Sequence, residues 1–196
     1  MEDRSRFGRK LRAARCSKMT ERIALLIDGD NLHHTVRNLG FEIDFKRLLQ
    51  EFGTLGTIVR AYFYTRIRDN DGFHSVRPLI DWLDYNGFTV KTTPVKEHDD
   101  GEGRRKTKRS IGVDLAVDAL EIARHVSHIF LLSGDGDFRR VAESVQRSGV
   151  RVTVVSSIRT SPPMASDELR RQANNFIEID TLRKSIERPL HPTAPE

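Results

Sequence analysis

The chain has 196 residues, with 33 Lys and Arg against 28 Asp and Glu and a formal net charge of +5. This length suits one domain with short tails, and it is enough to bury a core without disulfides or structural metal. The single cysteine, Cys16, excludes a disulfide framework and the cysteine-rich zinc patterns. No apolar run approaches the roughly 18 residues of a membrane-spanning helix, so we expect a protein of the cytoplasm.

Basic residues are concentrated in two parts of the chain. The first 18 residues are rich in Arg and Lys, and we expect residues 1–20 to be a basic, disordered tail. The second run lies in a long loop predicted at 96–110 and consists of Arg104, Arg105, Lys106, Lys108 and Arg109. Such runs are typical of phosphate contacts in nucleic-acid-binding proteins. For the N-terminal run, a solvated segment that only aids solubility is an equally good interpretation.

Apolar runs and helical periodicity predict strands that alternate with helices. The run Ile23–Ile27 is typical of a strand buried on both faces. A helix follows up to Gly40, and Asp44 is placed to cap a second helix that ends near Gly53. The further predicted strands are Thr57–Tyr64, Phe88–Val95, His128–Leu132, Arg151–Val155 and Phe176–Ile179. The further predicted helices are Val76–Gly87, with Pro78 in its first turn, then Val113–His125, Phe138–Ser148 and a short helix near Glu168.

This alternation predicts an α/β fold with a mostly parallel sheet and helices on both faces, because each crossover must return to the same edge. We expect the domain to span residues 21–182 and a disordered tail to occupy residues 183–196. In such folds ligands bind beyond the carboxyl ends of the strands. Acidic residues that end strands therefore point to one shared crevice.

Two of the predicted strands end in acidic turns that contain glycine. The first strand continues into Asp28-Gly29-Asp30-Asn31, and the strand before Ser133 continues into Ser133-Gly134-Asp135-Gly136-Asp137. A single Asp after a strand is most often a helix cap or a turn former. Two such turns at one edge of the sheet favour a shared acidic site instead.

The predicted helix Val113–His125 brings a third set of carboxylates. Its periodicity places Asp114, Asp118 and Glu121 on one side, where they repel each other unless a cation lies between them. They border an apolar stripe of the kind that normally faces the core, formed by Val113, Ala116, Val117 and Leu120. Grouped oxygen ligands without His or Cys favour Mg²⁺ or Mn²⁺ over zinc. Two such ions about 4 Å apart can activate a water and stabilise the leaving oxygen of a phosphodiester.

Three segments resemble the signature blocks of the NYN domain, in its LabA-like branch. They are Ile-Asp-Gly-Asp-Asn-Leu at 27–32, Gly-Val-Asp-Leu-Ala-Val-Asp at 112–118 and Leu-Ser-Gly-Asp-Gly-Asp-Phe at 132–138. The resemblance covers residues 21–182, and three blocks in the same order are specific together. It implies a PIN-like Rossmannoid fold, a three-layer sandwich with a mostly parallel central sheet. It also implies that the protein hydrolyses RNA, single-stranded or structured, with Mg²⁺ or Mn²⁺.

The same resemblance implies a set of site residues. The family's acidic positions, which would hold metal, are matched by Asp28, Asp114, Asp135 and Asp137. Asp118 and Asp137 would complete the metal shell or orient water, and Asn31 would bond a ligand or a substrate phosphate. One position departs from the family, which often has Lys directly before Gly-Val-Asp, whereas Ile111 stands there in this chain, with Lys108 and Arg109 upstream.

Several neighbouring residues have a structural interpretation beside the functional one. Ser133 is placed to donate its hydroxyl to a phosphate, but it is as readily a turn residue. His33 and His34 follow the first acidic turn, yet a water activated by metal needs no imidazole base, so we assign them no catalytic role. Tyr64, like most aromatic residues in strands, is expected in the core.

Two other classes of function stay open at this point. A phosphohydrolase of the haloacid dehalogenase type would use Asp28 as its nucleophile, but Asp135 and Asp137 are spaced more closely than in that superfamily. A non-catalytic RNA-binding or regulatory module would keep the acidic pocket for structural metal. The sequence is also compatible with a homo-oligomer, and it indicates no membrane partner.

Overall fold

Parallel strands form the central layer of the computed structural model, which describes residues 21–68, 73–95, 98–99, 105–106 and 111–189. The sheet has six strands in the order β3-β2-β1-β6-β7-β8, and every neighbouring pair is parallel. In chain order they are β1 (Arg22–Asp28), β2 (Thr57–Arg68), β3 (Thr89–Val95), β6 (His128–Leu132), β7 (Arg151–Ser156) and β8 (Asn175–Glu178). This is the predicted PIN-like Rossmannoid architecture, and each predicted strand is present, with β2 extending beyond Tyr64 to Arg68.

The strand order reverses between β1 and β6. From β1 the chain builds β2 and then β3 on one side, and afterwards it returns to place β6 on the other side of β1. The crossovers on the two sides therefore leave in opposite directions, and in such folds ligands bind at the carboxyl ends of the strands beside this reversal. The acidic turns that follow β1 and β6 both lie there.

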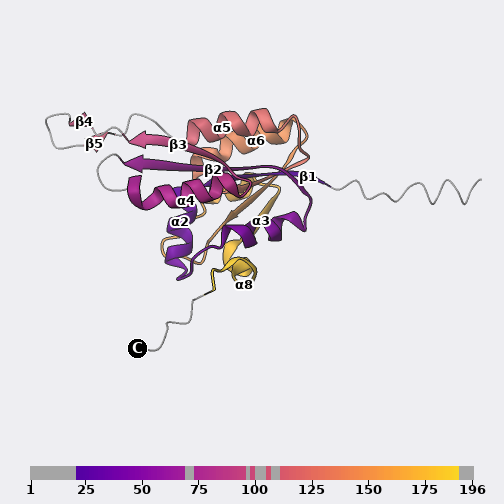
Figure 1. The fold of residues 1–196 in the computed structure, drawn as a ribbon. Helices are drawn as coiled ribbons and strands as arrows, with labels where there is room; N and C mark the ends of the chain where they lie inside the picture. The colour runs from indigo at the N-terminus through magenta and orange to yellow at the C-terminus, as the bar shows by residue number, and fades with distance from the viewer. Residues whose placement is uncertain (1–20, 69–72, 96–97, 100–104, 107–110, 190–196) are drawn as a thin grey trace, which may run out of the picture.

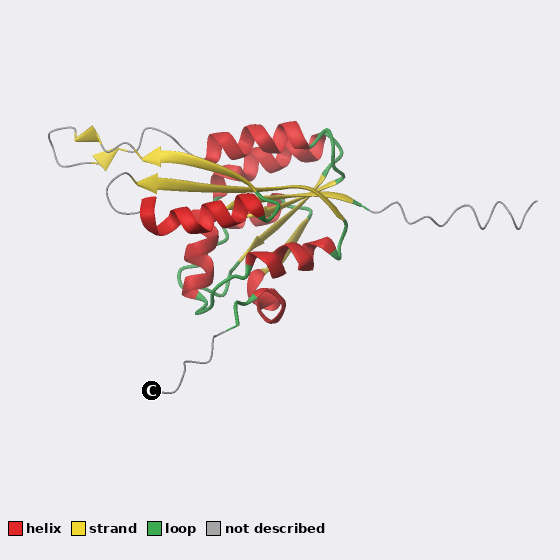
Figure 2. Ribbon diagram, in the orientation of Figure 1, coloured by secondary structure: helices red, strands yellow, loops and turns green. Residues whose placement is uncertain are grey.

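Helices cover both faces of the sheet (Figure 1, Figure 2). One face carries α5 (Ile111–Ile122), α6 (Arg139–Arg147) and α7 (Asp167–Gln172). The other carries α2 (Gly29–Asn38), α3 (Phe45–Gly53), α4 (Phe73–Tyr85) and α8 (Arg183–Ile186). Two 3-10 turns, η1 (Gly136–Phe138) and η2 (Ile179–Leu182), link β6 to α6 and β8 to α8. Part of the predicted loop at 96–110 forms a separate antiparallel pair, β4 (His98–Asp99) with β5 (Arg105–Lys106).

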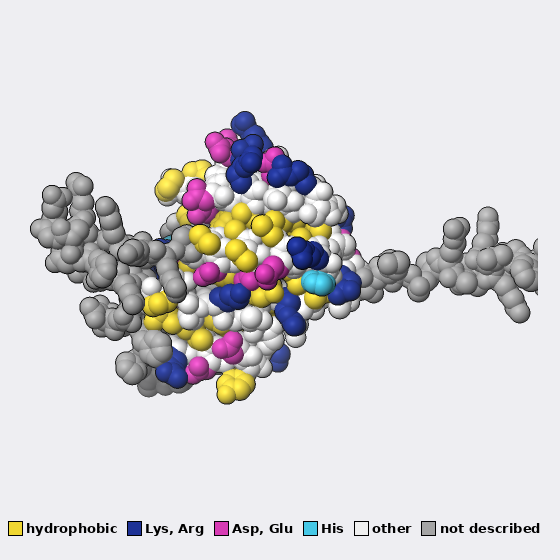
Figure 3. Space-filling model, turned by 90° about the horizontal axis from the view of Figure 1, so that it is seen from above, with side chains coloured by type: hydrophobic (Ala, Val, Ile, Leu, Met, Phe, Trp, Pro, Cys, Tyr) yellow, Lys and Arg dark blue, Asp and Glu magenta, His cyan; other side chains and the backbone are white. Residues whose placement is uncertain are grey.

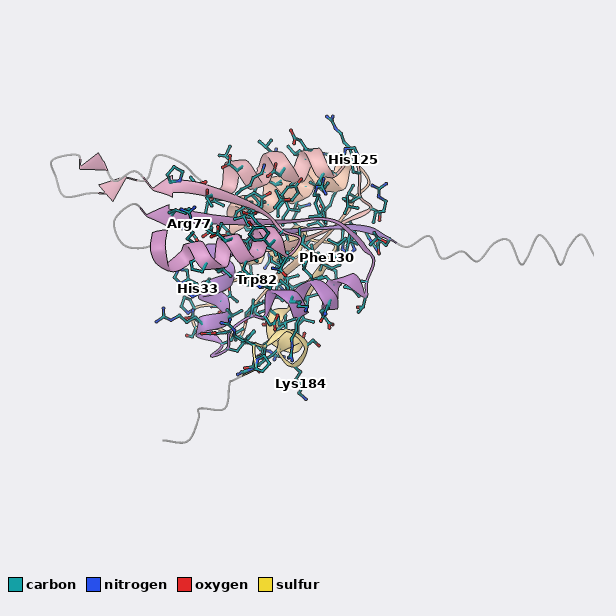
Figure 4. All side chains as sticks on the ribbon, in the orientation of Figure 1. His33, Arg77, Trp82, His125, Phe130 and Lys184 are labelled. Atoms are coloured by element: carbon teal, nitrogen blue, oxygen red, sulfur yellow. The ribbon has the colours of Figure 1, made fainter. Side chains whose placement is uncertain are left out.

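Burial of β1 on both faces explains its continuous apolar run. Ala24 and Leu26 belong to the core under α5 and α6, whereas Ile23, Leu25 and Ile27 belong to the core on the opposite face, and none of the five is exposed. The second core also holds Phe130 of β6 (Figure 4), whose ring meets that of Phe52 at a centroid distance of 4.9 Å.

Local signals in the sequence explain several helix starts. Asp44 caps α3 as predicted, because its Oδ1 accepts from the amides of Lys46 and Arg47 at 2.9 and 3.1 Å. The prediction for Pro78 is wrong, since α4 begins at Phe73 and Pro78 is its sixth residue. The helix starts before the apolar periodicity does, so α4 lacks the hydrogen bond that residue 78 would donate to the preceding turn.

The predicted apolar stripe of α5 faces solvent rather than the core. Val113, Val117 and Leu120 are 63%, 50% and 44% exposed, and apolar side chains run across the α5 and α6 face in Figure 3. The buried face consists of Ile111, Leu115, Asp118, Ala119 and Ile122. The prediction failed because α5 has apolar residues around most of its circumference, and periodicity alone does not choose between two such faces. A buried carboxylate, that of Asp118, lies on the face that was taken as polar.

The domain continues past residue 182, where the sequence analysis placed the start of a disordered tail. Helix α8 packs against α3, and the side chain of Ile186 is fully buried. The amide of Asp44 donates to the carbonyl of Ile186 at 2.8 Å, and the amide of Arg188 donates to that of Glu42 at the same distance. The segment is ordered because it covers apolar surface beside α3. The tails predicted at residues 1–20 and 190–196 lie outside the described residues.

No helix among the described residues is long and apolar enough to cross a membrane.

We expect Ile186→Ala to lower the free energy of unfolding by about 2–5 kcal/mol, because it removes a fully buried side chain and leaves a cavity. The exposed neighbour Ser185 provides the control, since Ser185→Ala should stay within about 0.5 kcal/mol of wild type. Urea unfolding measures both. An Ile186→Ala protein that unfolds at the wild-type midpoint would mean that α8 is not part of the cooperative domain.

Candidate active site at the carboxyl edge of the sheet

Asp28 lies at the strand-order reversal, as the last residue of β1 and the N-cap of α2. Its Oδ1 accepts from the amide of Asn31 at 3.1 Å, and its Oδ2 accepts from the hydroxyl of Ser133 at 3.2 Å. The side chain is only 9% exposed. Among the described residues, no Lys or Arg forms an ion pair with it. The carboxylate is thus held in place by neutral donors, without a compensating charge.

The turn after β6 is tied directly to the start of α2. The amide of Gly134 donates to Asn31 Oδ1 at 3.0 Å, and the amide of Asp135 donates to Ser133 Oγ at 3.2 Å. Gly134 is required here, because a Cβ at this position would lie 2.0 Å from the carbonyl oxygen of Met164. Asn31 and Ser133 were both predicted as substrate contacts. In the structure the Oδ1 atom of Asn31 and the Oγ atom of Ser133 instead accept the hydrogen bonds that join the end of β1 to the turn after β6.

Negative charge gathers around Asp28. Burial raises the pKa of its carboxyl, and the nearby charges of Asp30 and Asp135 raise it further, while the hydrogen bonds from Asn31 and Ser133 lower it in part. Asp30 pairs with Arg66 at 2.5 Å. Asp135 caps η1 by accepting from the amide of Asp137 at 3.0 Å, and Asp137 itself is exposed. Asp28 and Asp135 are therefore the two carboxylates that the structure brings together without a described cation.

The carboxylates of α5 form a second group, bound to β2 and β3. Asp118 is buried, and its two oxygens accept from the hydroxyl of Tyr64 and the ammonium of Lys91, each at 2.7 Å. Asp114, in the first turn of α5, is exposed and lies 3.4 Å from the hydroxyl of Thr93. Burial and the Asp118 carboxylate raise the pKa of Tyr64, so its phenol keeps its proton and donates to Asp118.

Sequence reasoning missed these partners on β2 and β3. Tyr64 is buried as predicted, but its hydroxyl has a polar role. The available signal was the alternation of Thr89, Lys91 and Thr93 along β3, which marks one face of that strand as polar. Nothing in the sequence says that α5 meets this face.

The strand register aligns the two acidic groups. Asp28 is the partner of Tyr64 in β2, and Tyr64 is the partner of Lys91 in β3. Partners in register point to the same face, and neighbouring strands are about 4.8 Å apart. Asp28 therefore lies on the α5 face of the sheet, with Tyr64 between it and Lys91.

The oxygen donors at this edge suit a divalent cation, although the described side chains do not form a complete set of metal ligands. No three His, Cys, Asp or Glu side chains of the described residues come together as a metal-binding group, so the predicted cluster of four metal ligands is not assembled by the protein alone. Asp28 and Asp135 nevertheless offer hard oxygen donors in a region of uncompensated negative charge. Mg²⁺ commonly binds through one or two carboxylates and completes its shell with water and substrate phosphates.

Most of the basic residues that were predicted to contact phosphate lie outside the described residues. Arg104, Lys108 and Arg109 lie outside the described residues, and Arg105 and Lys106 are known only as strand β5. The described part of the chain offers other basic groups near the edge. A hollow of about 360 Å³ between α6 and α7, beside η1, is lined by Arg139, Glu168, Arg171 and Gln172. His33 and His34 are exposed on α2 (Figure 4) and make an edge contact with each other.

Asp28→Asn should stabilise the metal-free protein at neutral pH. Because the pKa of Asp28 is raised in the folded state, its stabilising contribution is complete below the ordinary pKa of about 3.9 and is lost as the pH rises through the raised value. In EDTA, thermal melts should show a higher Tm for Asp28→Asn than for wild type at pH 7 and a shrinking difference toward pH 4. The exposed Asp81 of α4 serves as the control, since Asp81→Asn should give no such rise. A lower Tm for Asp28→Asn at pH 7 would show that its cap and Ser133 contacts outweigh the burial of its charge.

Comparison with known proteins identifies the family of the chain. The family model described as NYN domain matches residues 22–180. The low amplitude and bright protein LabA of Synechococcus elongatus is 32% identical over 175 residues, which cover 87% of this chain and 90% of LabA. The crystal structure of VPA0982, a protein of unknown function from Vibrio parahaemolyticus, superposes with a TM-score of 0.69 at 30% identity and covers 87% of this chain and 98% of its own. The chain therefore belongs to the NYN domain family.

Proposed function

We propose that this protein is a ribonuclease that uses Mg²⁺ or Mn²⁺ to hydrolyse RNA phosphodiester bonds. Membership in the NYN family, part of the PIN-like nuclease superfamily, supports a nuclease and replaces the haloacid dehalogenase alternative. The observation that carries the proposal is Asp28, a buried carboxylate at the strand-order reversal with Asp135 nearby and no described cation to neutralise them. A buried charge of this kind is costly unless a cation binds there.

Each acidic residue has a role that follows from its contacts. Asp28 and Asp135 would hold the metal ion, with exposed Asp114 and Asp137 able to complete its shell or orient water. Bound Mg²⁺ or Mn²⁺ supplies an activated water and stabilises the leaving oxygen. Asn31 and Ser133 fix the orientation of Asp28 and the position of the turn that carries Asp135. Asp118 is not a ligand in this scheme, because Tyr64 and Lys91 occupy both of its oxygens.

RNA is the proposed substrate, and two sets of basic groups would bind its backbone. One set is the run from Arg104 to Arg109, which precedes α5 in the chain. The other is formed by Arg139 and Arg171 in the hollow beside η1. Phosphate contacts of this type position a nucleic acid without reading its sequence.

A non-catalytic RNA-binding module is the second candidate. The observation that favours it is that no three carboxylates among the described residues converge as a metal-binding group. Such a module would bind RNA in the same place without turnover.

Incubation of the purified protein with labelled single-stranded and duplex RNA, in Mn²⁺, Mg²⁺ or EDTA, tests the proposal. We expect cleavage only with metal, and a fall of at least about a hundredfold in Asp28→Asn and in Asp114→Asn, because each removes a charge that neutralises metal beside a polyanion. Asp81→Asn, which changes an exposed carboxylate on α4, should cleave like wild type.

Two other outcomes would contradict the proposal in different ways. Cleavage that persists in EDTA would rule out the metal-dependent reaction. Tight RNA binding without cleavage under any metal condition would instead support the non-catalytic module.

A further inference from the structure

Lys91 is a described cation beside the carboxylates of α5. Its Nζ lies 2.7 Å from Asp118 Oδ1 and 5.7 Å from the centre of the Tyr62 ring. The hydrogen bond to Asp118 is the largest of the effects that raise the pKa of Lys91, so the ammonium keeps its charge. The Lys91 side chain is 40% exposed, whereas that of Asp118 is 7% exposed. The ion pair thus has a buried anion and a cation that still reaches solvent.

The ammonium of Lys91 has unused capacity on its solvent side. An ammonium carries three N–H donors, and Asp118 Oδ1 accepts from one of them. The Tyr62 ring provides a cation–π contact that restricts the side chain without accepting a conventional hydrogen bond. Among the described residues, Lys91 is held on these two sides alone, and an ammonium so placed is arranged to donate its remaining N–H groups to an anionic ligand.

Burial of the Asp118 carboxylate costs desolvation free energy. A pair whose cation is 40% exposed gains little stability in return if its only task is to connect α5 to β3. Apolar contacts already hold α5 in place, through Leu115, Ala119 and Ile122. The Asp118 carboxylate also takes a second hydrogen bond from Tyr64, which fixes the direction in which it holds the Lys91 ammonium. Stability of α5 alone does not call for this network.

The position of Lys91 relative to Asp28 suits a substrate that crosses the edge of the sheet. Register places Asp28, Tyr64 and Lys91 on three neighbouring strands. At about 4.8 Å per strand, the backbone of Lys91 lies about 10 Å from that of Asp28. A strand of RNA bound with one phosphate at Asp28 therefore has a neighbouring phosphate within reach of a lysine side chain on β3.

We propose that Lys91 binds a backbone phosphate of RNA next to the one at Asp28, and that Asp118 is the residue that positions Lys91 for this contact. The inference rests on the proposed function, because RNA is its ligand. The family often has a Lys directly before Gly-Val-Asp, and this chain has Ile111 at that position. In this inference Lys91 of β3 supplies a basic group in its place.

Equilibrium binding of fluorescently labelled single-stranded RNA in EDTA, between about 50 and 200 mM salt, tests this inference without cleavage. The Lys91→Gln protein should bind RNA more weakly than wild type, because it lacks one phosphate contact. The slope of its log affinity against log salt should be smaller in magnitude by about 0.7. Lys91→Arg should restore the slope. Lys46→Gln is the matched control, since Lys46 is an exposed lysine on α3, on the opposite face of the sheet, and it should leave both quantities unchanged.

Two further variants separate the binding contact from stability. Asp118→Asn keeps the charge of Lys91 but loosens its position, so the salt slope should stay near wild type while affinity falls. If Lys91→Gln fails to fold because it leaves Asp118 unpaired, the double variant Lys91→Gln/Asp118→Asn removes both charges together, and its slope should match the value expected for Lys91→Gln. Thermal melts identify the folded variants.

The possible results distinguish the inference from the function on which it rests. A folded Lys91→Gln or double variant with the wild-type salt slope overturns the role of Lys91 while leaving RNA binding intact. Wild-type protein that neither binds RNA in EDTA nor binds or cleaves it with Mg²⁺ or Mn²⁺ overturns the proposed function, and the inference with it.

Discussion

The parallel pairing of β1 with β6 is the constraint on which the rest of the structure depends. It joins the two cores, because alternate residues of β1 face opposite layers of helices, and it brings two acidic turns together at the carboxyl ends of the strands. The hydrogen bond from Gly134 to Asn31 then fixes the ends of the strands relative to each other. The position of Asp28 is therefore a consequence of strand order, and a change in the pairing would displace every group around it.

The two buried carboxylates of the described residues differ in their partners. Asp118 accepts hydrogen bonds from the phenol of Tyr64 and the ammonium of Lys91, so its charge is balanced within the described residues. Asp28 receives only neutral donors and has like charges near it. This difference separates an anion whose charge is balanced by described residues from one that is left to attract a cation. The same fold thus supplies a balanced pair and an unbalanced charge at neighbouring positions of one sheet edge.

Sequence patterns were sufficient for the features that depend on local order. The apolar run before Asp28 predicted a strand buried on both faces, and Asp44 predicted the start of α3. The orientation of α5 was not predictable in this way, because its apolar residues surround most of the helix, and the deciding contact is a carboxylate that meets β2 and β3. Lys91 was missed for a related reason, since its partner is 27 residues away and belongs to another element.

The central place of β1 also affects how the chain folds as it is made. Asp28 and Ser133, which meet at the ends of β1 and β6, stand 105 residues apart. At a synthesis rate of about 5–20 residues per second, β6 follows β1 out of the ribosome after about 5–20 seconds. During that interval one edge of β1, with its five consecutive apolar residues Ile23–Ile27, has no partner, and such an edge is open to association with other chains. The strand that organises the finished sheet is thus the one that depends longest on protection during synthesis.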